Sequence, residues 1–247
     1  MIELSSSTWT DMRDVLASGP PLAVLPFGAL EQHGPHLPLD TDTRQAEAIA
    51  RGIASGLDAV LLPSIEYGNT WGNAAFPGTV SLSVDTVAAI CGDIAASLDA
   101  AGFALLVVVN GDYGNRLPLQ LAAEKRAAAG ERMPVLVLDY PGLVDIGDQV
   151  KESPWAAPGL CHADELETSM MLAIFPDTVH PERFAAEYPE LPPDFGQRPQ
   201  ALAPLGETGV FGDPRAATAA KGEQIIAHVV TQSLAAIERT LRSLGLR

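Results

Sequence analysis

The sequence contains few cysteines and few cationic side chains. Only two cysteines occur in 247 residues, Cys91 and Cys161, and they lie far apart without a CxxC spacing. A disulfide framework or a zinc ribbon needs closely spaced pairs, so the sequence predicts neither. Lys and Arg number 15 against 31 Asp and Glu, which gives a net charge of −16. Because binding to a phosphate backbone requires clustered cationic side chains, we expect no nucleic-acid partner.

Long apolar runs are scarce as well. The N-terminal stretch MIELSSSTWTDMRD has neither a basic segment nor an apolar run. No later segment reaches the roughly 20 apolar residues of a membrane span. We therefore expect a cytoplasmic protein without a membrane span or secretory signal, whose partners are small molecules, cations or other proteins.

Apolar runs alternate with alanine-rich segments over most of the chain. Four runs, at 20–30, 59–65, 103–110 and 133–140, have the length and continuity of strands covered on both faces. Residues 43–57, 83–102 and 114–130 place apolar side chains at helical spacing between these runs. This βαβ order predicts an α/β fold, a largely parallel sheet flanked by helices, in a single domain over residues 1–247.

The last third of the chain has fewer regular segments. A helix is expected at 165–175, followed at about 187–210 by a segment rich in Pro and Gly that we predict to be a loop or lid. A final amphipathic helix is expected from about 216 to 243. Its apolar side is predicted to consist of Ile226, Val230, Leu234, Ile237 and Leu241.

The stretch GALEQHGPHLPLDTDT, residues 28–43, holds two of the five histidines and three carboxylates. It follows the first predicted strand, and ligands of open α/β sheets bind beyond the carboxyl ends of the strands. If the extended backbone continues, Glu31 and His33 point to the same side, and Asp42 follows just before a helix. These three side chains form a candidate metal site, and a carboxylate at this place, Asp40 or Asp42, can bridge two divalent ions through its two oxygens.

Other polar residues of this stretch need no metal. Asp40 or Thr41 is expected to cap the helix that starts near Thr43, and His36 to be an ordinary loop residue.

Asp112 is a further candidate ligand. It lies just past the most apolar predicted strand, in the turn NGDYGN, and a carboxylate there suits Mg, Mn, Fe or Zn. The alternative is that Asp112 only caps the next helix. Asn110 and Asn115 are expected to hold this turn by side-chain hydrogen bonds.

A second group of polar residues starts at His162. It directly precedes the helix predicted at 165–175, whose start carries Asp164 and Glu165, acids that a helix N-terminus favours by its dipole alone. A histidine at this place can serve proton transfer, because its ordinary pKa lies near operating pH. The alternative is a buried structural histidine.

Four stretches resemble the creatininase family of metal-dependent amidohydrolases. They are GALEQHGPHLPLDTDT (28–43), FPGTVSL (76–82), HADELETSMML (162–172) and TGVFGDPRAATAAKGE (208–223). They occur in the family's order and span almost the whole chain. The resemblance implies a creatininase-type α/β fold, one or two divalent ions, hydrolysis of a C–N bond of a small molecule, and commonly a homohexamer.

The resemblance also assigns roles to residues. It implies that Glu31, His33 and Asp42 are metal ligands, with Asp42 between the ions. It further implies that His162 moves a proton to the leaving nitrogen and that Glu167 belongs to the site. Two roles stay open for Glu167, a ligand of a second ion or a residue that orients a ligand. The expected ions are Zn, Mn or Fe.

Three departures from the family concern the substrate. Relatives carry NGHGGN or, in creatininases proper, NGHYEN, where this chain has NGDYGN. Asp112 thus replaces a metal-binding histidine, and Gly114 stands where creatininases proper have a glutamate ligand. A histidine that is common just before FPGT is absent, since the residues there are Asn73, Ala74 and Ala75. These differences argue against creatinine as the substrate.

Two other functions fit the same residues. One branch of the family is a peptidase that trims a precursor peptide during maturation of a redox cofactor. A non-catalytic metal-binding relative is the other alternative. Loss of catalysis would not be expected to spare the whole set of site residues, Glu31, His33, Asp42, His162 and Glu167, which argues against it.

Overall fold

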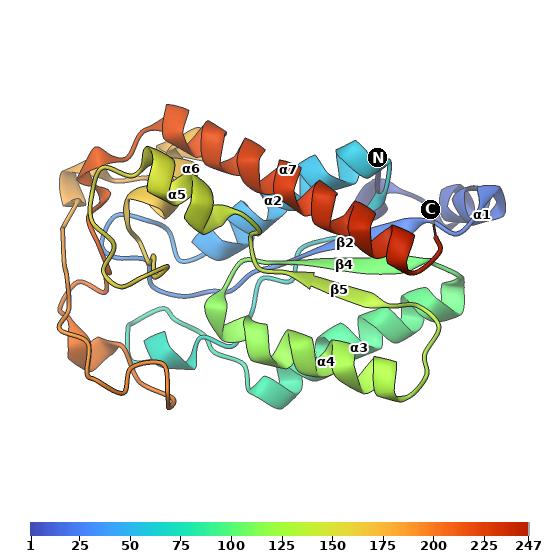
Figure 1. Cartoon of the computed structure of the whole chain (residues 1–247), viewed down its shortest axis with the longest axis horizontal. Coiled ribbons are helices and arrows are strands. Elements are labelled where there is room, and N and C mark those ends of the chain that lie inside the picture. Colours follow the sequence, from blue (N-terminus) through green and yellow to red (C-terminus); the bar gives the residue numbers. More distant parts are fainter. Residues whose placement is uncertain (247) are drawn as a thin grey trace.

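In the computed structural model, which describes residues 1–246, five parallel strands form one sheet between layers of helices (Figure 1). The strands are β1 (Ile2–Glu3), β2 (Leu22–Phe27), β3 (Val60–Leu61), β4 (Leu105–Asn110) and β5 (Val135–Leu138). Their order across the sheet is β1-β3-β2-β4-β5, and every neighbouring pair is parallel. The predicted α/β fold with a largely parallel sheet is confirmed.

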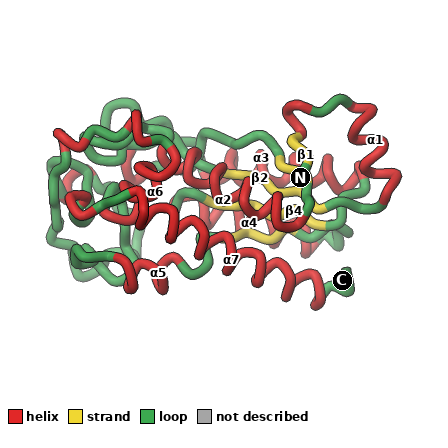
Figure 2. Tube along the Cα trace, turned by 90° about the horizontal axis from the view of Figure 1, so that it is seen from above, coloured by secondary structure: helices red, strands yellow, loops and turns green. Residues whose placement is uncertain are grey.

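Helices cover both faces of this sheet. They are α1 (Trp9–Ser18), α2 (Thr41–Leu57), α3 (Val84–Ala101), α4 (Arg116–Ala128), α5 (Leu143–Val150), α6 (Glu165–Ile174) and α7 (Ala219–Ser243). In Figure 1, α2, α5, α6 and α7 lie above the sheet and α3 and α4 below it. Figure 2 shows α1 beside β1, at the end of the molecule opposite to α6. None of the described helices combines the length and the apolar composition that crossing a bilayer requires.

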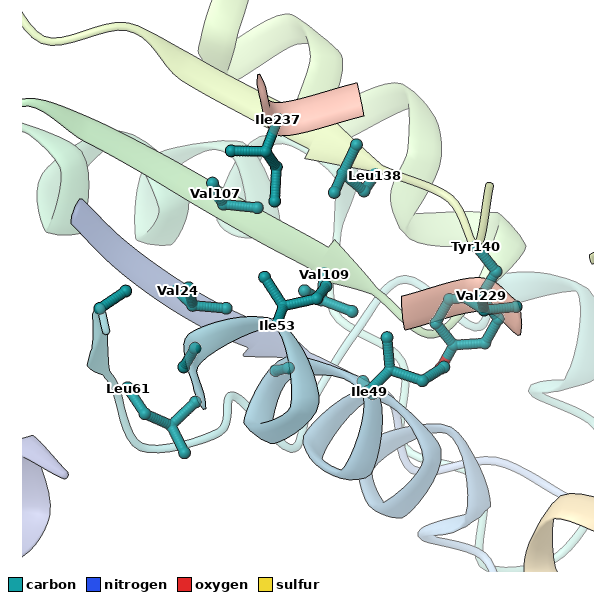
Figure 3. Close-up of a cluster of buried hydrophobic side chains, with 14 of the residues drawn as sticks. Val24, Ile49, Ile53, Leu61, Val107, Val109, Leu138, Tyr140, Val229 and Ile237 are labelled. Atoms are coloured by element: carbon teal, nitrogen blue, oxygen red, sulfur yellow. The ribbon is translucent and has the colours of Figure 1, made fainter. Parts of the chain in front are cut away.

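Apolar side chains of the strands alternate between the two layers. Val24 and Val107 pack against α2 and α7 (Figure 3). Their sequence neighbours Leu25 and Leu106 belong to the second core, on the side of α3 and α4. Because both faces of these strands are buried, nearly every strand residue is apolar, which is the pattern that predicted them.

Several elements differ from their predicted bounds. The run 20–30 forms a strand only over Leu22–Phe27, and the run 59–65 only over Val60–Leu61. The last helix begins at Ala219 rather than at about 216. β1, α1 and α5 were not predicted, since β1 has two residues and the two helices are short.

The buried side of α7 is wider than the predicted stripe. The residues buried along it are Gly222, Ile225, Val229, Ser233, Ile237 and Leu241. Val230 and Leu234, which were predicted to line the apolar side, are only half-buried and lie against Gly52 and Gly56 of α2. Because α7 packs on both α2 and α6, two neighbouring stripes of the helix are covered.

The strand direction brings distant loops together. In Figure 1 the strand arrows point towards the end of the molecule where the orange segment that includes residues 187–210 lies, and both chain ends lie at the opposite end. Parallel strands finish at the same edge, so the loop after β2 and the turn after β4 meet there. The start of α6 faces the same place.

Candidate metal centre

The six residues predicted for the site all lie together at the carboxyl ends of β2 and β4. They are Glu31, His33, Asp42, Asp112, His162 and Glu167, and each is at most 9% exposed. The first three come from the loop after β2 and the first turn of α2, the fourth from the turn after β4, and the last two from the segment that leads into α6. The site is therefore a buried cluster at the edge where the parallel strands end.

Three overlapping groups of these side chains offer ligand atoms within 4.8 Å of one another. Glu31, Asp42 and Asp112 form one group, and His33, Asp42 and Glu167 form a second. Asp42 belongs to both, as a carboxylate between two ions would. His162 joins Glu31 and His33 in the third group. Such carboxylate and imidazole sets suit Zn, Mn or Fe.

The surroundings of His33 leave one ring nitrogen directed at the carboxylates. Its Nδ1 lies 3.2 Å from the backbone oxygen of Glu31, an acceptor, so Nδ1 carries the hydrogen. Its Nε2 has no hydrogen-bond partner and lies 3.0 Å from Asp42 Oδ1 and 3.8 Å from Glu167 Oε2. A nitrogen lone pair facing two carboxylates is stable when a cation lies between them, so this geometry fits a metal ion.

The loop reaches the site by a different path from the predicted one. β2 ends at Phe27, and only isolated bridges follow, Leu30 with Val80 and His33 with Pro35. The predicted continuation of the strand through residue 33 is therefore wrong. The side chains at 31 and 33 still lie in one cluster, because the loop turns back and the backbone N–H of residue 31 donates to the oxygen of Leu39 at 2.9 Å.

Asp112 combines the two roles that the sequence left as alternatives. Its Oδ1 accepts a hydrogen bond from the backbone N–H of Gly114 at 3.1 Å, which caps the short helical turn that follows. Its Oδ2 is buried and has no hydrogen-bond partner. This second oxygen is available beside Glu31 and Asp42.

The turn around Asp112 depends on glycine and asparagine. A Cβ at Gly111 would lie 2.5 Å from the backbone oxygen of Asp42, and a Cβ at Gly114 would lie 1.9 Å from that of Asn69. No side chain fits at 114 in this backbone, so a glutamate ligand there is excluded. Asn110 Nδ2 donates to the backbone oxygen of Asp112 at 2.8 Å, and Asn115 Nδ2 donates to that of Gly28 at 2.9 Å. Both asparagines thus hold the loops as expected.

Burial raises the pKa of all four site carboxyls. It raises the pKa of Glu31 and of Asp42 well above the ordinary values, and the charge of Asp112 raises both further. Burial likewise raises the pKa of Asp112 to about 6 and that of Glu167 to about 8. Among the described residues, the ion pairs of these carboxyls are with histidines, not with Lys or Arg. Cations are the compensating charge that this arrangement fits.

These raised pKa values make the stability of the metal-free protein depend on pH. Between the ordinary pKa of Glu167, 4.5, and its folded value of about 8, the folded chain binds more protons than the unfolded chain. The free energy of unfolding is therefore expected to fall as pH rises from 5 to 8. The fall is about 1.4 kcal/mol for every tenfold difference between the acid dissociation constants of Glu167 in the folded and the unfolded chain. Urea denaturation with chelator at both pH values measures this loss. Adding Zn or Mn at pH 8 should restore the stability, and a metal-free protein that is equally stable at both pH values would contradict the argument.

Two amide side chains of the site were missed in the sequence. Gln32 Nε2 lies 2.8 Å from His162 Nε2, and Asn73 Nδ2 donates to Glu31 Oε2 at 2.9 Å. Burial, and then the charge of His33, lower the pKa of His162 well below its ordinary value. The sequence offered one signal for these two residues, their position within the motifs. Gln32 lies between two predicted ligands, and Asn73 lies shortly before FPGT.

His36 and Tyr140 are two more residues whose burial the sequence did not indicate. His36 lies in the loop as expected, but its ring is buried, with Nε2 2.9 Å from Thr168 Oγ1, and burial lowers its pKa to about 4. Tyr140 has a φ of 46° in the left-handed region, and its buried hydroxyl has no hydrogen-bond partner. Burial raises the pKa of Tyr140, and the charges of Asp42 and Glu167 raise it further.

Of the acidic residues at the N-caps of α2 and α6, only the one before α6 caps its helix with the side chain. Asp40 stands at the N-cap of α2, but its side chain makes no capping bond and instead accepts from Arg44 Nε at 2.7 Å, so the expected cap is wrong. Asp164 caps α6, accepting from the backbone N–H of Leu166 at 2.9 Å. It also pairs with the buried Lys151 at 2.9 Å, which ties the segment before α6 to the end of α5.

The segment at about 187–210 contacts the loops around the site at two places. Within it the described structure contains one short helical turn, Ala203–Leu205. Leu202 N–H donates to the oxygen of Gly72 at 2.8 Å, and the oxygen of Gly209 accepts from Gln32 Nε2 at 3.0 Å. These contacts hold the segment over the loops that carry the ligands. Its opening as a lid stays a prediction.

Comparison with known proteins assigns the chain to a family of hydrolases. A family model described as creatininase, creatinine amidohydrolase, matches residues 5–237. The mycofactocin precursor peptide peptidase of Mycolicibacterium smegmatis is 34% identical over 252 residues, which covers 96% of this chain and 93% of that protein. The creatinine amidohydrolase of Pseudomonas putida is 30% identical over 241 residues, which covers 92% of each.

Solved structures agree with this assignment. A crystal structure of creatinine amidohydrolase matches with a TM-score of 0.86 at 29% identity, over 97% of each chain. Two further creatininase structures, a variant of the Zn-Zn type and a Mn form, match at a TM-score of 0.85 and 29% identity, over 96% and 97% of this chain and 98% of each of theirs. Since the family model spans nearly the whole chain and the fold agrees, this protein is a hydrolase of the creatininase family.

Proposed function

We propose that this protein hydrolyses an amide or a related C–N bond with one or two divalent ions at the buried cluster. The observation that carries the proposal is a cluster of four buried carboxyls, two of which lie 3.0 and 3.8 Å from the unpartnered Nε2 of His33. None of the four has a Lys or Arg among its described ion-pair partners. A structural role would not require this much uncompensated charge in one place, because buried charge without a partner is costly.

Two of the three groups would hold the ions. Glu31, Asp42 and Asp112 would bind the first, with the unpartnered Oδ2 of Asp112 in place of the usual histidine. His33, Asp42 and Glu167 would bind the second. Glu167 is then a ligand rather than a residue that orients one, and it supplies the carboxylate that cannot be placed at position 114. Three anionic oxygens at the first position favour Mn, Fe or Zn over softer ions.

A bound divalent ion lowers the pKa of water and polarises a carbonyl, which is the chemistry that amide hydrolysis requires. His162 holds a proton beside Glu31, with its Nδ1 3.8 Å from Glu31 Oε1. There it would pass its Nδ1 proton to the departing nitrogen in concert with uptake of the proton released by the attacking water, so that the neutral ring does not become an anion. The segment at about 187–210 covers the site and keeps bulk water away from this exchange.

A peptide substrate is the second candidate. The match to a precursor peptide peptidase over 96% of this chain favours it. Tyr113, next to Asp112 along the chain, is 78% exposed and would offer aromatic surface to a substrate longer than creatinine. Creatine is bound in one of the related structures, so a small molecule stays the alternative.

Metal analysis followed by a substrate screen tests the proposal. Protein purified without chelator is expected to carry Mn, Fe or Zn. The loaded protein is then assayed with lactams, formamides, creatinine and short peptides, and release of an amine from any of them supports hydrolysis. In a competition titration, Asp112→His is expected to shift preference from Mn towards Zn. Protein that binds none of these ions and hydrolyses none of these compounds would disprove the proposed function.

Two further properties stay predictions, the homohexamer that the family resemblance implies and the cytoplasmic location expected from the sequence. Assembly as a homohexamer is checked by sedimentation of the purified protein. A cytoplasmic location is checked by fractionation of the cells that produce it.

A further inference from the structure

The orientation of the Gln32 side chain is determined by two backbone groups. The N–H of Gly34 donates to Gln32 Oε1 at 2.8 Å, and Gln32 Nε2 donates to the oxygen of Gly209 at 3.0 Å. A backbone N–H can only donate and a carbonyl can only accept. Exchanging the amide oxygen and nitrogen would therefore set donor against donor and acceptor against acceptor. The nitrogen of Gln32 is the atom that faces His162.

This contact determines which nitrogen of His162 carries a proton. Gln32 Nε2 lies 2.8 Å from His162 Nε2, and its two hydrogens are shared among this nitrogen, the oxygen of Gly209 and Asn73 Oδ1. An amide nitrogen has no lone pair with which to accept a hydrogen from His162. His162 Nε2 must therefore accept. A neutral imidazole has one N–H, which is then at Nδ1. Both residues are less than 9% exposed, so water offers no alternative partner for a proton at Nε2.

A ring of contacts connects this choice to the candidate metal ligands. Asn73 Oδ1 accepts from Gln32 Nε2 at 3.0 Å, and Asn73 Nδ2 donates to Glu31 Oε2 at 2.9 Å. The ring closes at His162, whose Nδ1 lies 3.8 Å from Glu31 Oε1. The imidazole also lies with its centre 4.6 Å from that of His33. The hydrogen at Nδ1 therefore faces the cluster.

We propose that Gln32 is a positioning residue that holds His162 as the neutral Nδ1–H tautomer. The proposed function uses this hydrogen as the proton for the leaving nitrogen, and in that respect the inference rests on it. The tautomer also removes His162 from metal binding, because Nδ1 is protonated and the lone pair of Nε2 is engaged by Gln32. The group of Glu31, His33 and His162 is then not a three-ligand metal site.

Nitrogen NMR of the histidine side chains tests this assignment directly. In protein labelled with 15N-histidine, measured both metal-free and loaded with zinc, His162 is expected to show a protonated Nδ1 and an unprotonated Nε2. Loss of its signals in His162→Gln identifies them. Gln32→Glu places a carboxylate oxygen against Nε2, so the hydrogen is expected to move to Nε2. Gln120→Glu makes the same chemical change on an exposed position of α4 and should leave the His162 signals unchanged.

Kinetics separate positioning from a merely structural role. Gln32→Glu is expected to lower turnover by about 10- to 100-fold, the usual effect of losing a residue that orients a functional side chain, with zinc content unchanged. Gln32→Met keeps the size of the side chain but has no N–H donor, so His162 is expected to populate both neutral tautomers in this variant. If Gln32→Glu does not fold, the nitrogen NMR spectra of the wild type and of Gln32→Met still test whether Gln32 sets the tautomer of His162.

A wild-type His162 protonated at Nε2, or a tautomer unaltered in Gln32→Glu and Gln32→Met, would overturn the inference. Failure of the proposed function looks different. The tautomer would then respond to Gln32 as described while no screened amide is hydrolysed.

Discussion

Glu31→Gln is expected to abolish tight binding of at least one ion and to lower turnover by more than about 100-fold, since loss of a residue that only orients a ligand already costs about 10- to 100-fold. Glu31 belongs to two of the three candidate groups, so its charge serves more than one ligand position. A glutamine there keeps an oxygen for Asn73 Nδ2, which now bonds Glu31 Oε2 at 2.9 Å. It turns an amide towards the other carboxylates, however, and an amide nitrogen cannot ligate a cation.

The same variant is expected to be more stable than the wild type when both are metal-free. Removing the Glu31 carboxyl relieves the cost of its burial and its repulsion by Asp112 and Asp42, which together raise its pKa. Elemental analysis and thermal unfolding with chelator measure the two effects, and Glu66→Gln, at an exposed position, is the matched control. Full metal occupancy in Glu31→Gln would show that the site is assigned wrongly.

His162→Ala is expected to lower turnover by about 100- to 10,000-fold, the usual contribution of general acid or base catalysis. Metal content should stay close to that of the wild type, because neither nitrogen of His162 has a free lone pair for an ion. The chain offers a control in His180→Ala, whose side chain is 45% exposed and pairs with Glu182.

Measurements of kcat and of bound metal on the same preparations separate proton transfer from ligation. Unchanged turnover would reduce His162 to a structural residue. Loss of metal along with activity would instead make it a ligand, and would count against the tautomer inferred from Gln32.

Much of the fold follows from local patterns. The run that became β4 is apolar over almost its whole length because both faces of the strand are covered, and this continuity is visible in the sequence. The candidate ligands at 31, 33 and 42 lie within twelve positions of one another, so one loop and one helix turn carry them. Such features need no knowledge of the rest of the chain, because their geometry depends on near neighbours.

The sequence by itself determined the parallel α/β sheet, the six residues of the candidate site and the resemblance to the creatininase family. It could not determine the partners that come from distant segments. Gln32 and His162 are 130 positions apart. The contact that assigns the proton of His162 exists only when the loop after β2 and the segment before α6 meet in the folded chain. A side chain is likewise excluded at Gly114 because the backbone oxygen of Asn69, 45 positions away, would lie 1.9 Å from its Cβ. Contacts between such segments result from the packing of whole elements, and only the tertiary structure decides them.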